Sequence, residues 1–227
     1  MKTNTKQPSS RRGNLRNGNH RIVNSRQINP REPELKLKIG VMGSASGNIP
    51  ERYLQRARII GSAIAEQNCI VITGACPGLP LAAAHGAHDA GALVVGISPG
   101  LSLDEHRLKY HSPVEHHDVL IFTGSGLMGR EVVNIRTSDM VVILGGRSGT
   151  LGELAIAYDE GKLIGVLLDM GGISDMVESI LAVCRKNTGA KVLYDHDPHR
   201  LISRIVRTYR LEHYKKPSVF EQRRLEK

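Results

Sequence analysis

Short apolar runs alternate with longer amphipathic segments along the middle of the chain. Each run spans four to eight residues, and most are rich in valine and isoleucine, which favours buried strands. The segments between them place apolar residues at helical spacing, as 50–68 does with Leu54, Ala57 and Ile64 on one face. The alternation predicts an α/β fold with a single doubly wound, Rossmann-like parallel sheet and helices on both faces. The predicted strands are 35–42, 69–73, 92–97, 119–122, 140–144, 162–169 and 191–194.

Glycine-rich turns follow three of these strands. The sequence reads GSASG after the first strand, GACPG after the second and GGRSG after the fifth. In a parallel sheet these turns share the carboxyl edge, which is where open α/β sheets bind ligands. Glycine lets the backbone come close to a ligand, and the helix expected to start near Thr150 offers unpaired N–H groups and a positive dipole end. The pattern predicts a ligand that carries a phosphate.

Two charged residues flank the strand 140–144. Arg130 opens the predicted helix before it, which Asp139 closes, and Glu153 lies in the first turn of the predicted helix after it. If the strands on either side of the first helix are parallel neighbours, both side chains reach the carboxyl edge, where they suit a sugar phosphate and a bond to it. Thr150-x-x-Glu153 is also the pattern of a capping box, and an isolated arginine is often a solvated helix residue, so structural roles stay open for both.

The same residues resemble a known family. The segment GGRSGTLGE is similar to the PGGxGTxxE signature of the LONELY GUY (LOG) family, formerly called lysine decarboxylases, and Arg130 with Ser138-Asp139 resembles the family's RK…M…SDA segment. The resemblance covers about residues 38–198. It implies a homodimeric phosphoribohydrolase that releases a free base, often a cytokinin, from a nucleoside 5′-monophosphate. It also implies that Arg130 and Glu153 are the catalytic pair, with no metal or cofactor required.

Four departures from the family pattern open a second interpretation. Gly145 replaces a proline, Arg147 a glycine, Glu131 a lysine, and Gly152 the first acid of a glutamate pair. A loop of this form is closer to a sister branch that includes molybdenum-cofactor carrier proteins. The alternative is therefore a non-catalytic binder: a carrier with bound molybdenum cofactor, or a sensor with bound nucleotide. In either case the residues expected to bind substrate or phosphate are Gly43, Ser44, Gly74, Gly145, Gly146, Arg147, Ser148, Gly149 and Thr150.

Histidines, acids and one cysteine supply further candidate ligands. Imidazole and carboxylate are ordinary metal ligands, but the segment 101–118 has no HExxH or HxH pattern, and neighbours such as His116 and His117 would point to opposite faces of a strand. A solvated loop over the pocket is the favoured interpretation. For Cys76, the role of a small buried cysteine is favoured over contact with a ligand. The remaining residues of this kind are His85 and His88 on a helix, and His106, His111, Glu115 and Asp118 in the loop.

The positive charge belongs to the two ends of the chain. The net charge is +9 for the 227 residues, yet residues 1–38 contribute +8, residues 199–227 contribute +6, and the middle contributes −5. This predicts a basic disordered tail at 1–34, a folded domain at 35–212 and a basic tail at 213–227. Such tails can contact nucleic acid or anionic surfaces weakly and nonspecifically, although aromatic residues for stacking are not interleaved with the charges.

Composition points to the cytoplasm. Three cysteines without a CxxC pair favour a reducing compartment. No apolar run approaches the roughly 20 residues that a membrane-spanning helix needs. The arginine-rich, acid-poor start is compatible with an organellar transit peptide, but its many asparagines favour a plain tail.

Overall fold

The computed structural model describes Met1 and residues 35–213, and the folded unit within that range begins at Lys36. Most of both predicted tails, 2–34 and 214–227, therefore lies outside the described residues. The unit is built on one sheet of seven parallel strands in the order β4-β3-β2-β1-β5-β6-β7, so the predicted fold is confirmed. The strands are β1 (Lys38–Gly43), β2 (Ile70–Thr73), β3 (Val94–Ser98), β4 (Val119–Phe122), β5 (Met140–Leu144), β6 (Leu163–Leu167) and β7 (Lys191–Asp195).

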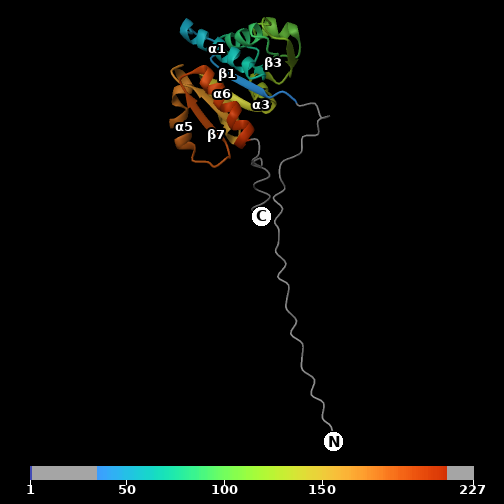
Figure 1. Cartoon of the computed structure of the whole chain (residues 1–227). Coiled ribbons are helices and arrows are strands. Elements are labelled where there is room, and N and C mark those ends of the chain that lie inside the picture. The colour runs from blue at the N-terminus through green and yellow to red at the C-terminus, as the bar shows by residue number, and fades with distance from the viewer. Residues whose placement is uncertain (2–34, 214–227) are drawn as a thin grey trace. The chain divides into compact units, whose positions relative to one another are not determined.

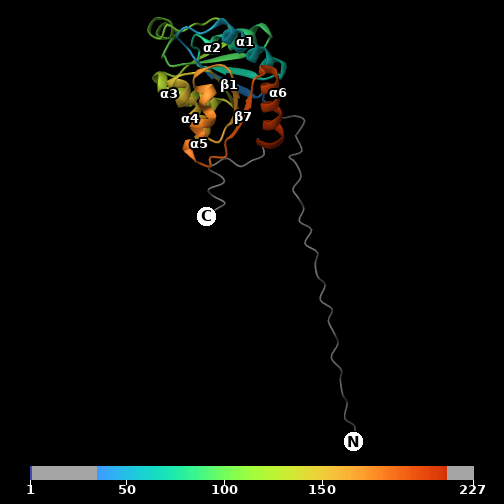
Figure 2. The same ribbon diagram turned by 90° about the vertical axis from the view of Figure 1, so that its left-hand side faces the viewer.

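Helices cover both faces of the sheet. On one face lie α1 (Glu51–Glu66), α2 (Leu79–Asp89) and α6 (Pro198–Thr208); on the other lie α3 (Gly126–Thr137), α4 (Ser148–Asp159) and α5 (Val177–Cys184), as Figures 1 and 2 show. Single turns complete the described elements: η1 (Glu105–Lys109), η2 (Gly172–Met176) and η3 (Tyr209–His213). Within the described residues, no helix is long and apolar enough to cross a membrane.

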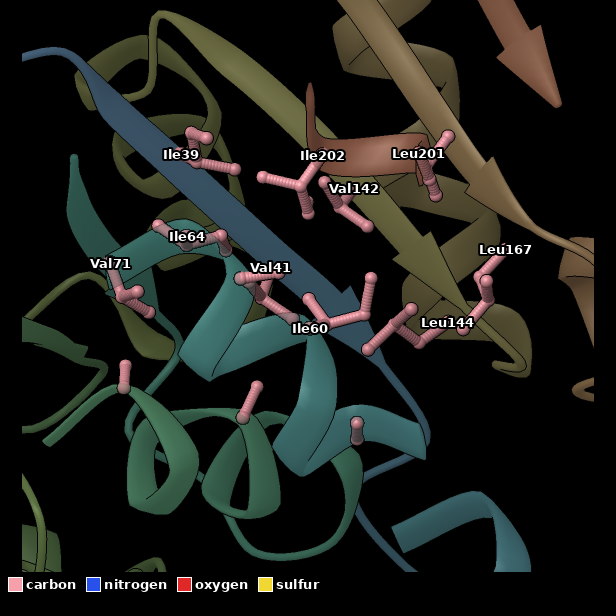
Figure 3. Close-up of a cluster of buried hydrophobic side chains, with 14 of the residues drawn as sticks. Ile39, Val41, Ile60, Ile64, Val71, Val142, Leu144, Leu167, Leu201 and Ile202 are labelled. Atoms are coloured by element: carbon pink, nitrogen blue, oxygen red, sulfur yellow. The ribbon is translucent and has the colours of Figure 1, made fainter. Parts of the chain in front are cut away.

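Alternation along the central strands supplies two separate cores. Ile39 and Val41 of β1 point toward α1, where they pack with Ile60 and Ile64 (Figure 3). Met42 belongs to the second core, which lies under α3 and α4. Successive side chains of a strand point to opposite faces, so a strand buried on both sides must be apolar throughout. This explains the unbroken apolar run of β5, in which every residue is buried.

Helices α1 and α2 pack against each other without side chains at two positions. A Cβ atom at Gly61 would lie 2.0 Å from the Ala83 carbonyl oxygen, and one at Gly86 would lie 2.0 Å from the Arg58 carbonyl oxygen. Only glycine permits this approach. The contact fixes α2, and therefore the side chains on its outer face, relative to the loop that follows β1.

The order of the strands reverses between β1 and β5. One assumption made from the sequence, that the strands on either side of α3 are neighbours, therefore does not hold. Strand β4 lies at the edge of the sheet and β5 at its centre, so the strands on either side of α3 are not neighbours. Helix α3 instead crosses the sheet over β3, β2 and β1. It still delivers its side chains to the carboxyl edge, beside the point where the strand order reverses. Ligands of open α/β sheets bind at such a point.

Two helix boundaries differ from the prediction. The helix that carries Arg130 begins four residues earlier, at Gly126, and ends at Thr137. Asp139 does not close it; the Asp139 carboxylate instead accepts hydrogen bonds of 2.8 Å from the Lys38 backbone N–H and side-chain amine, which tie β5 to β1. Helix α4 begins at Ser148 rather than near Thr150.

Candidate functional site

The β5–α4 turn is held in one conformation by its neighbours. Gly145 and Gly146 have φ angles of +57° and +104°, which glycine adopts at little cost. The Gly146 N–H donates to the Ser44 Oγ at 2.9 Å, while the Gly145 and Gly146 carbonyls accept from Ser174 and Ile173. The turn therefore joins the ends of β1 and β5, and brings the predicted residues Gly43, Ser44, Gly145 and Gly146 together.

The first turn of α4 faces this edge with unpaired donors. Ser148, Gly149 and Thr150 are its first three residues, so their N–H groups have no acceptor within the helix. Ser148 and Gly149 are exposed, whereas Thr150 is buried and packs its side chain against Gly146. A helix start with free N–H groups and a positive dipole end attracts an anionic group.

Arg147 lies at the N-cap position of α4 but does not cap it. Its side chain is exposed and its guanidinium donates a hydrogen bond to the Ser46 hydroxyl in the β1–α1 loop. The arginine thus bridges two glycine-rich turns at the mouth of the site. It neither blocks the free N–H groups by a side-chain hydrogen bond nor enters the buried part of the site.

Arg130 is buried at the end of β2. Only 7% of the residue is exposed, and its Nη1 donates to the Gly74 carbonyl oxygen. A Cβ atom at Gly74 would lie 1.8 Å from this Nη1, so the glycine is required by the arginine that packs on it. Burial raises the pKa of the neighbouring Cys76 thiol, and the positive charge of Arg130 lowers it. Gly74 and Arg130, two of the predicted site residues, therefore lie in direct contact.

Glu153 lies opposite Arg130, in the second turn of α4 rather than the first. The capping-box interpretation is wrong, because Thr150 is the third residue of the helix and not its N-cap. The side chain is 7% exposed, and within residues 35–213 its carboxyl has no hydrogen bond and no ion pair within 4.0 Å. Burial raises the pKa of Glu153 to about 8, with Arg130 lowering it and Glu131 raising it further.

Glu131 enters the same buried space, and sequence analysis did not identify it as part of the site. Only 5% of the residue is exposed, and burial raises the pKa of its carboxyl. A Cβ atom at Gly152 would lie 2.9 Å from the Glu131 Oε2. Two of the departures from the LOG pattern are therefore linked: the glycine at 152 leaves the room that the glutamate at 131 occupies. The paired departures were the signal for this contact.

Unpaired polar atoms gather on the face of α3 that carries these residues. Among residues 35–213, the buried atoms Arg130 Nε, Glu131 Oε2 and Asn134 Oδ1 have no hydrogen-bond partner. Buried polar atoms are rarely left unpaired without a reason, because each costs about 1–3 kcal/mol. Three such atoms on one helix face make this part of α3 a candidate for contact with a bound ligand.

The loop histidines separate into two kinds. His106 hydrogen-bonds to the Ser98 hydroxyl and the Pro113 carbonyl oxygen, and His117 contacts the Thr73 hydroxyl and the Glu115 carbonyl oxygen, all at 2.8–2.9 Å. Both hold the loop against the sheet. His116 points elsewhere, as predicted for adjacent residues, and its ring stacks on that of His85 from α2 at a centroid distance of 4.0 Å.

A cavity of about 480 Å³ lies beside the glycine turns of β1 and β2. The β1–α1 loop lines it with Ser46 and Gly47, the β2–α2 turn with Pro77 and Gly78, and histidines lie at its rim. Ser46 is also the acceptor of the Arg147 hydrogen bond, so the cavity adjoins the start of α4. Arg130, Glu153 and residues 145–150 do not line this cavity, so it lies beside the buried acid and the anion donors rather than around them.

Solved structures and a curated relative resemble this chain. A molybdenum cofactor binding protein from the phototrophic bacterium Rippkaea orientalis has 28% identity and a TM-score of 0.63, covering 77% of this chain and 98% of that one. The molybdenum cofactor carrier protein of Chlamydomonas reinhardtii has 26% identity and a TM-score of 0.59, covering 76% and 98%. An uncharacterised protein of Archaeoglobus fulgidus is 34% identical over 131 residues, covering 58% of this chain and 80% of the relative.

The family model agrees with the resemblance that the sequence motifs indicate. It matches residues 36–202, which include the sheet, the glycine turns, Arg130 and Glu153. The chain belongs to the SLOG cluster4 family, a branch of the LOG-like superfamily.

Proposed function

We propose that this protein binds a nucleoside 5′-monophosphate at the carboxyl edge between β1 and β5 and hydrolyses its N-glycosidic bond. The observation that carries the proposal is the buried pair of Arg130 and Glu153 beside the free N–H groups of α4. One group of donors suits the phosphate, and the buried acid suits the bond to the base. Membership of the LOG-like superfamily is compatible with this reaction.

The phosphate would bind at the first turn of α4. The N–H groups of Ser148, Gly149 and Thr150 can donate to its oxygens, and Gly145 and Gly146 supply the positive φ angles of the turn that leads into the helix. Arg147 lies at the mouth of the site, where turning from Ser46 toward the phosphate would add a planar, permanently charged donor.

Glu153 would supply the proton that the leaving base needs. A carboxyl with a pKa of about 8 is mostly protonated at pH 7, so it can act as a general acid. The C1′–N bond breaks as the base nitrogen takes this proton, and the oxygen of a water molecule bonds to C1′. The water returns one proton to the Glu153 carboxylate, so the products are free base and ribose 5-phosphate and the acid is restored.

Arg130 would stabilise the charged form of Glu153 rather than take part in proton transfer. Its guanidinium is fixed by the Gly74 carbonyl and lies near enough to Glu153 to influence its pKa. When Glu153 gives up its proton, the resulting carboxylate faces a permanent positive charge. The arginine thereby stabilises the charge that develops in the transition state.

The test is direct. The purified full chain is incubated with AMP, GMP, CMP and isopentenyl-AMP, and free base and ribose 5-phosphate are quantified. We expect release by the wild-type protein and its loss in Glu153→Gln, while Glu178→Gln, an exposed glutamate on α5, serves as the matched control. Equal release by wild type and Glu153→Gln would overturn the proposed mechanism, and no release from any nucleotide would overturn the hydrolase.

A carrier is the second candidate, and the named structures favour it. One of these structures is named a molybdenum cofactor carrier protein and the other a molybdenum cofactor binding protein. Both are 26–28% identical to this chain over most of their length. In a carrier the same edge would hold the phosphate of a pterin cofactor without turnover. The discriminating measurement is molybdenum content by mass spectrometry, together with the fluorescence of oxidised pterin released by acid, on protein expressed in a host that makes the cofactor. Stoichiometric cofactor and no base release would favour the carrier.

A second copy of the chain is the expected partner of the apolar surface at β4. Val119, Ile121 and Phe122 of this edge strand are 39–44% exposed, and Leu127 and Met128 on α3 are more exposed still. An unpaired edge strand that carries apolar side chains favours association. Light scattering on the eluting protein should give a dimer mass, and Ile121→Glu should lower it to that of a monomer. A wild-type monomer would contradict the expected homodimer.

Two expectations complete the proposal. The reducing cytosol remains the expected compartment, because all three cysteines are free. Contact of the basic tails with nucleic acid or anionic surfaces would be weak, sensitive to salt and independent of the site.

A further inference from the structure

A second group of chemically active side chains lies outside the proposed catalytic site. His85 and Asp89 come from α2, and His116 comes from the loop before β4. One ligand atom of each lies within 4.8 Å of the ligand atoms of the other two. The sequence separates these residues by up to 31 positions, and the sequence argument treated the helix histidines and the loop histidines as unrelated features.

The helix contributes a preformed pair. The His85 Nε2 lies 3.1 Å from the Asp89 Oδ2, one helical turn away. Two atoms bound to a tetrahedral ion with bonds of about 2.0–2.1 Å are separated by roughly 3.3 Å, so this pair already has the spacing of one edge of such a site. A neighbouring imidazole, that of His88, has its ring centroid 5.6 Å from the His116 ring.

An ordinary helix ion pair would explain His85 and Asp89 but not His116. The His116 backbone adopts a φ angle of +60°, in the left-handed region, which histidine, asparagine and aspartate enter more often than other residues with a side chain. In this conformation its ring reaches α2 and lies nearly parallel to the His85 ring, with 12° between the planes. His117, the next residue, is held against Thr73, so the loop is fixed while His116 is directed toward the helix.

We propose that His85, Asp89 and His116 form a binding site for a divalent transition-metal ion of the zinc class. Two imidazoles and one carboxylate match the ligand set of open zinc sites, in which three protein ligands leave a position for water or for an added ligand. Two atoms on one ion with such bonds lie at most about 4.2 Å apart, and the stacked His85 and His116 rings do not both aim a nitrogen at one point, so binding requires side-chain rotations that turn the rings and bring the ligand atoms together. Such rotations are available, since all three residues lie at or near the surface.

The position of this site gives the ion a role. His85 and His116 line the cavity whose other residues include Ser46 and Gly47 of the β1–α1 loop. The open coordination position therefore faces the space beside the proposed phosphate site, where it can accept an oxygen or sulfur donor of a bound ligand. The ion would anchor the part of the ligand that lies farthest from α4, and the proposed hydrolysis does not require it.

The test uses the full-length chain without a histidine tag, after dialysis against a chelator. Cobalt(II) is titrated with visible absorption as the readout, and zinc(II) binding is measured by calorimetry. We expect one ion per chain and the absorption bands of cobalt in a low-symmetry site containing nitrogen ligands. His116→Asn should weaken binding by more than the roughly 10- to 100-fold that loss of an outer-shell partner costs.

A matched control lies in the same loop. His111 is exposed and also has a positive φ angle, +47°, so His111→Asn makes the same change in a similar backbone conformation outside the cluster. Asparagine tolerates this conformation, so both variants should fold. His111→Asn should bind the ion as the wild-type protein does. Absence of stoichiometric binding by the wild-type chain, or equal weakening in the two variants, would overturn the proposal and would leave the proposed nucleotide site untouched.

Discussion

Two buried carboxyl groups lie at the same edge of the sheet but differ in their hydrogen bonds and in the direction of their pKa shifts. Asp195, at the end of β7, is 4% exposed and accepts five hydrogen bonds at 2.6–2.9 Å, from Arg200, Arg204 and the Asp197 N–H. Glu153, on α4, is 7% exposed and accepts none within the described chain. Hydrogen bonds from Arg200 hold the pKa of Asp195 well below its usual range, whereas burial raises that of Glu153 to about 8.

The contrast agrees with a structural role for Asp195 and with the chemical role proposed for Glu153. Hydrogen bonds to the charged form compensate Asp195 for its burial, so this residue joins β7 to α6. Glu153 accepts no such hydrogen bonds, so burial favours its protonated form, beside the Arg130 guanidinium and the Glu131 carboxyl. Perturbed pKa values of this kind concentrate at functional sites. The comparison therefore supports the proposed site at the reversal point between β1 and β5 over the more charged cluster at β7.

The largest expected effect tests this assignment through activity. Replacing Glu153 by glutamine removes the exchangeable proton and should lower the rate of base release by roughly 10²- to 10⁴-fold, the usual contribution of a general acid. Asp195→Asn should leave the rate constant of the folded protein within a few-fold. Steady-state rates at pH 7, corrected for the folded fraction by circular dichroism, measure both. A greater loss in Asp195→Asn would reverse the comparison.

The second effect concerns stability and has the opposite sign. Because the pKa of Glu153 is raised from 4.5 to about 8, the folded state keeps a proton that the unfolded chain loses. The stabilising contribution of the neutral form is complete below pH 4.5 and is lost as the pH rises through about 8. Glu153→Gln should therefore raise the free energy of unfolding at pH 8 by on the order of a few kcal/mol. Urea unfolding at pH 5 and pH 8 measures it, and a gain of equal size at both values would contradict the buried proton.

Asp195 should respond on the acid side of the pH range. Its folded-state pKa is lowered, so its contribution to stability is present above the unfolded value of 3.8 and is lost only as the pH falls toward the folded value. Asp195→Asn should destabilise the protein by about 1–2 kcal/mol at pH 7, a modest figure because both arginines keep much of their contact with solvent. Thermal unfolding from pH 3 to pH 7 should show the difference between the variant and the wild type beginning to narrow only below about pH 4. A difference that is constant with pH would assign the loss to packing.

The fold and the carboxyl edge could be predicted from the sequence because they depend on local patterns. Apolar runs 119–122 and 140–144 match β4 and β5 residue for residue, and Asp197 caps α6 as the Asp-Pro pattern indicates. Glycine marks positions where another group comes too close for a side chain, as the Arg130 guanidinium does at Gly74 and the Thr150 side chain at Gly146.

What could not be predicted depends on contacts between distant segments. The start of α4 is set by the conformation of the turn and not by an N-cap side chain, so the Thr-x-x-Glu pattern was misleading. Strand order decides that α3 crosses three strands, and only this crossing places Glu131 against α4. The meeting of His85 with His116 likewise requires a loop and a helix that no periodicity connects. Pairwise contacts of this kind leave no signal in the spacing of residues along the chain.

The smallest effect examines how the space beside Glu153 is shared between Glu131 and Gly152. Alanine is intrinsically favoured over glycine in a helix by about 1 kcal/mol, but the Cβ of Gly152→Ala would lie 2.9 Å from the Glu131 Oε2. The carboxyl must shift within a buried space, and this cost should offset the helical gain, so the single variant should be near neutral. In a Glu131→Ala background the obstacle is gone, and Gly152→Ala should stabilise by the full amount of about 1 kcal/mol. A double-mutant cycle from urea unfolding measures the coupling. If Gly152→Ala has the same effect in both backgrounds, the two residues are independent; a coupling near 1 kcal/mol would show that Glu131 occupies the space that an alanine at 152 needs.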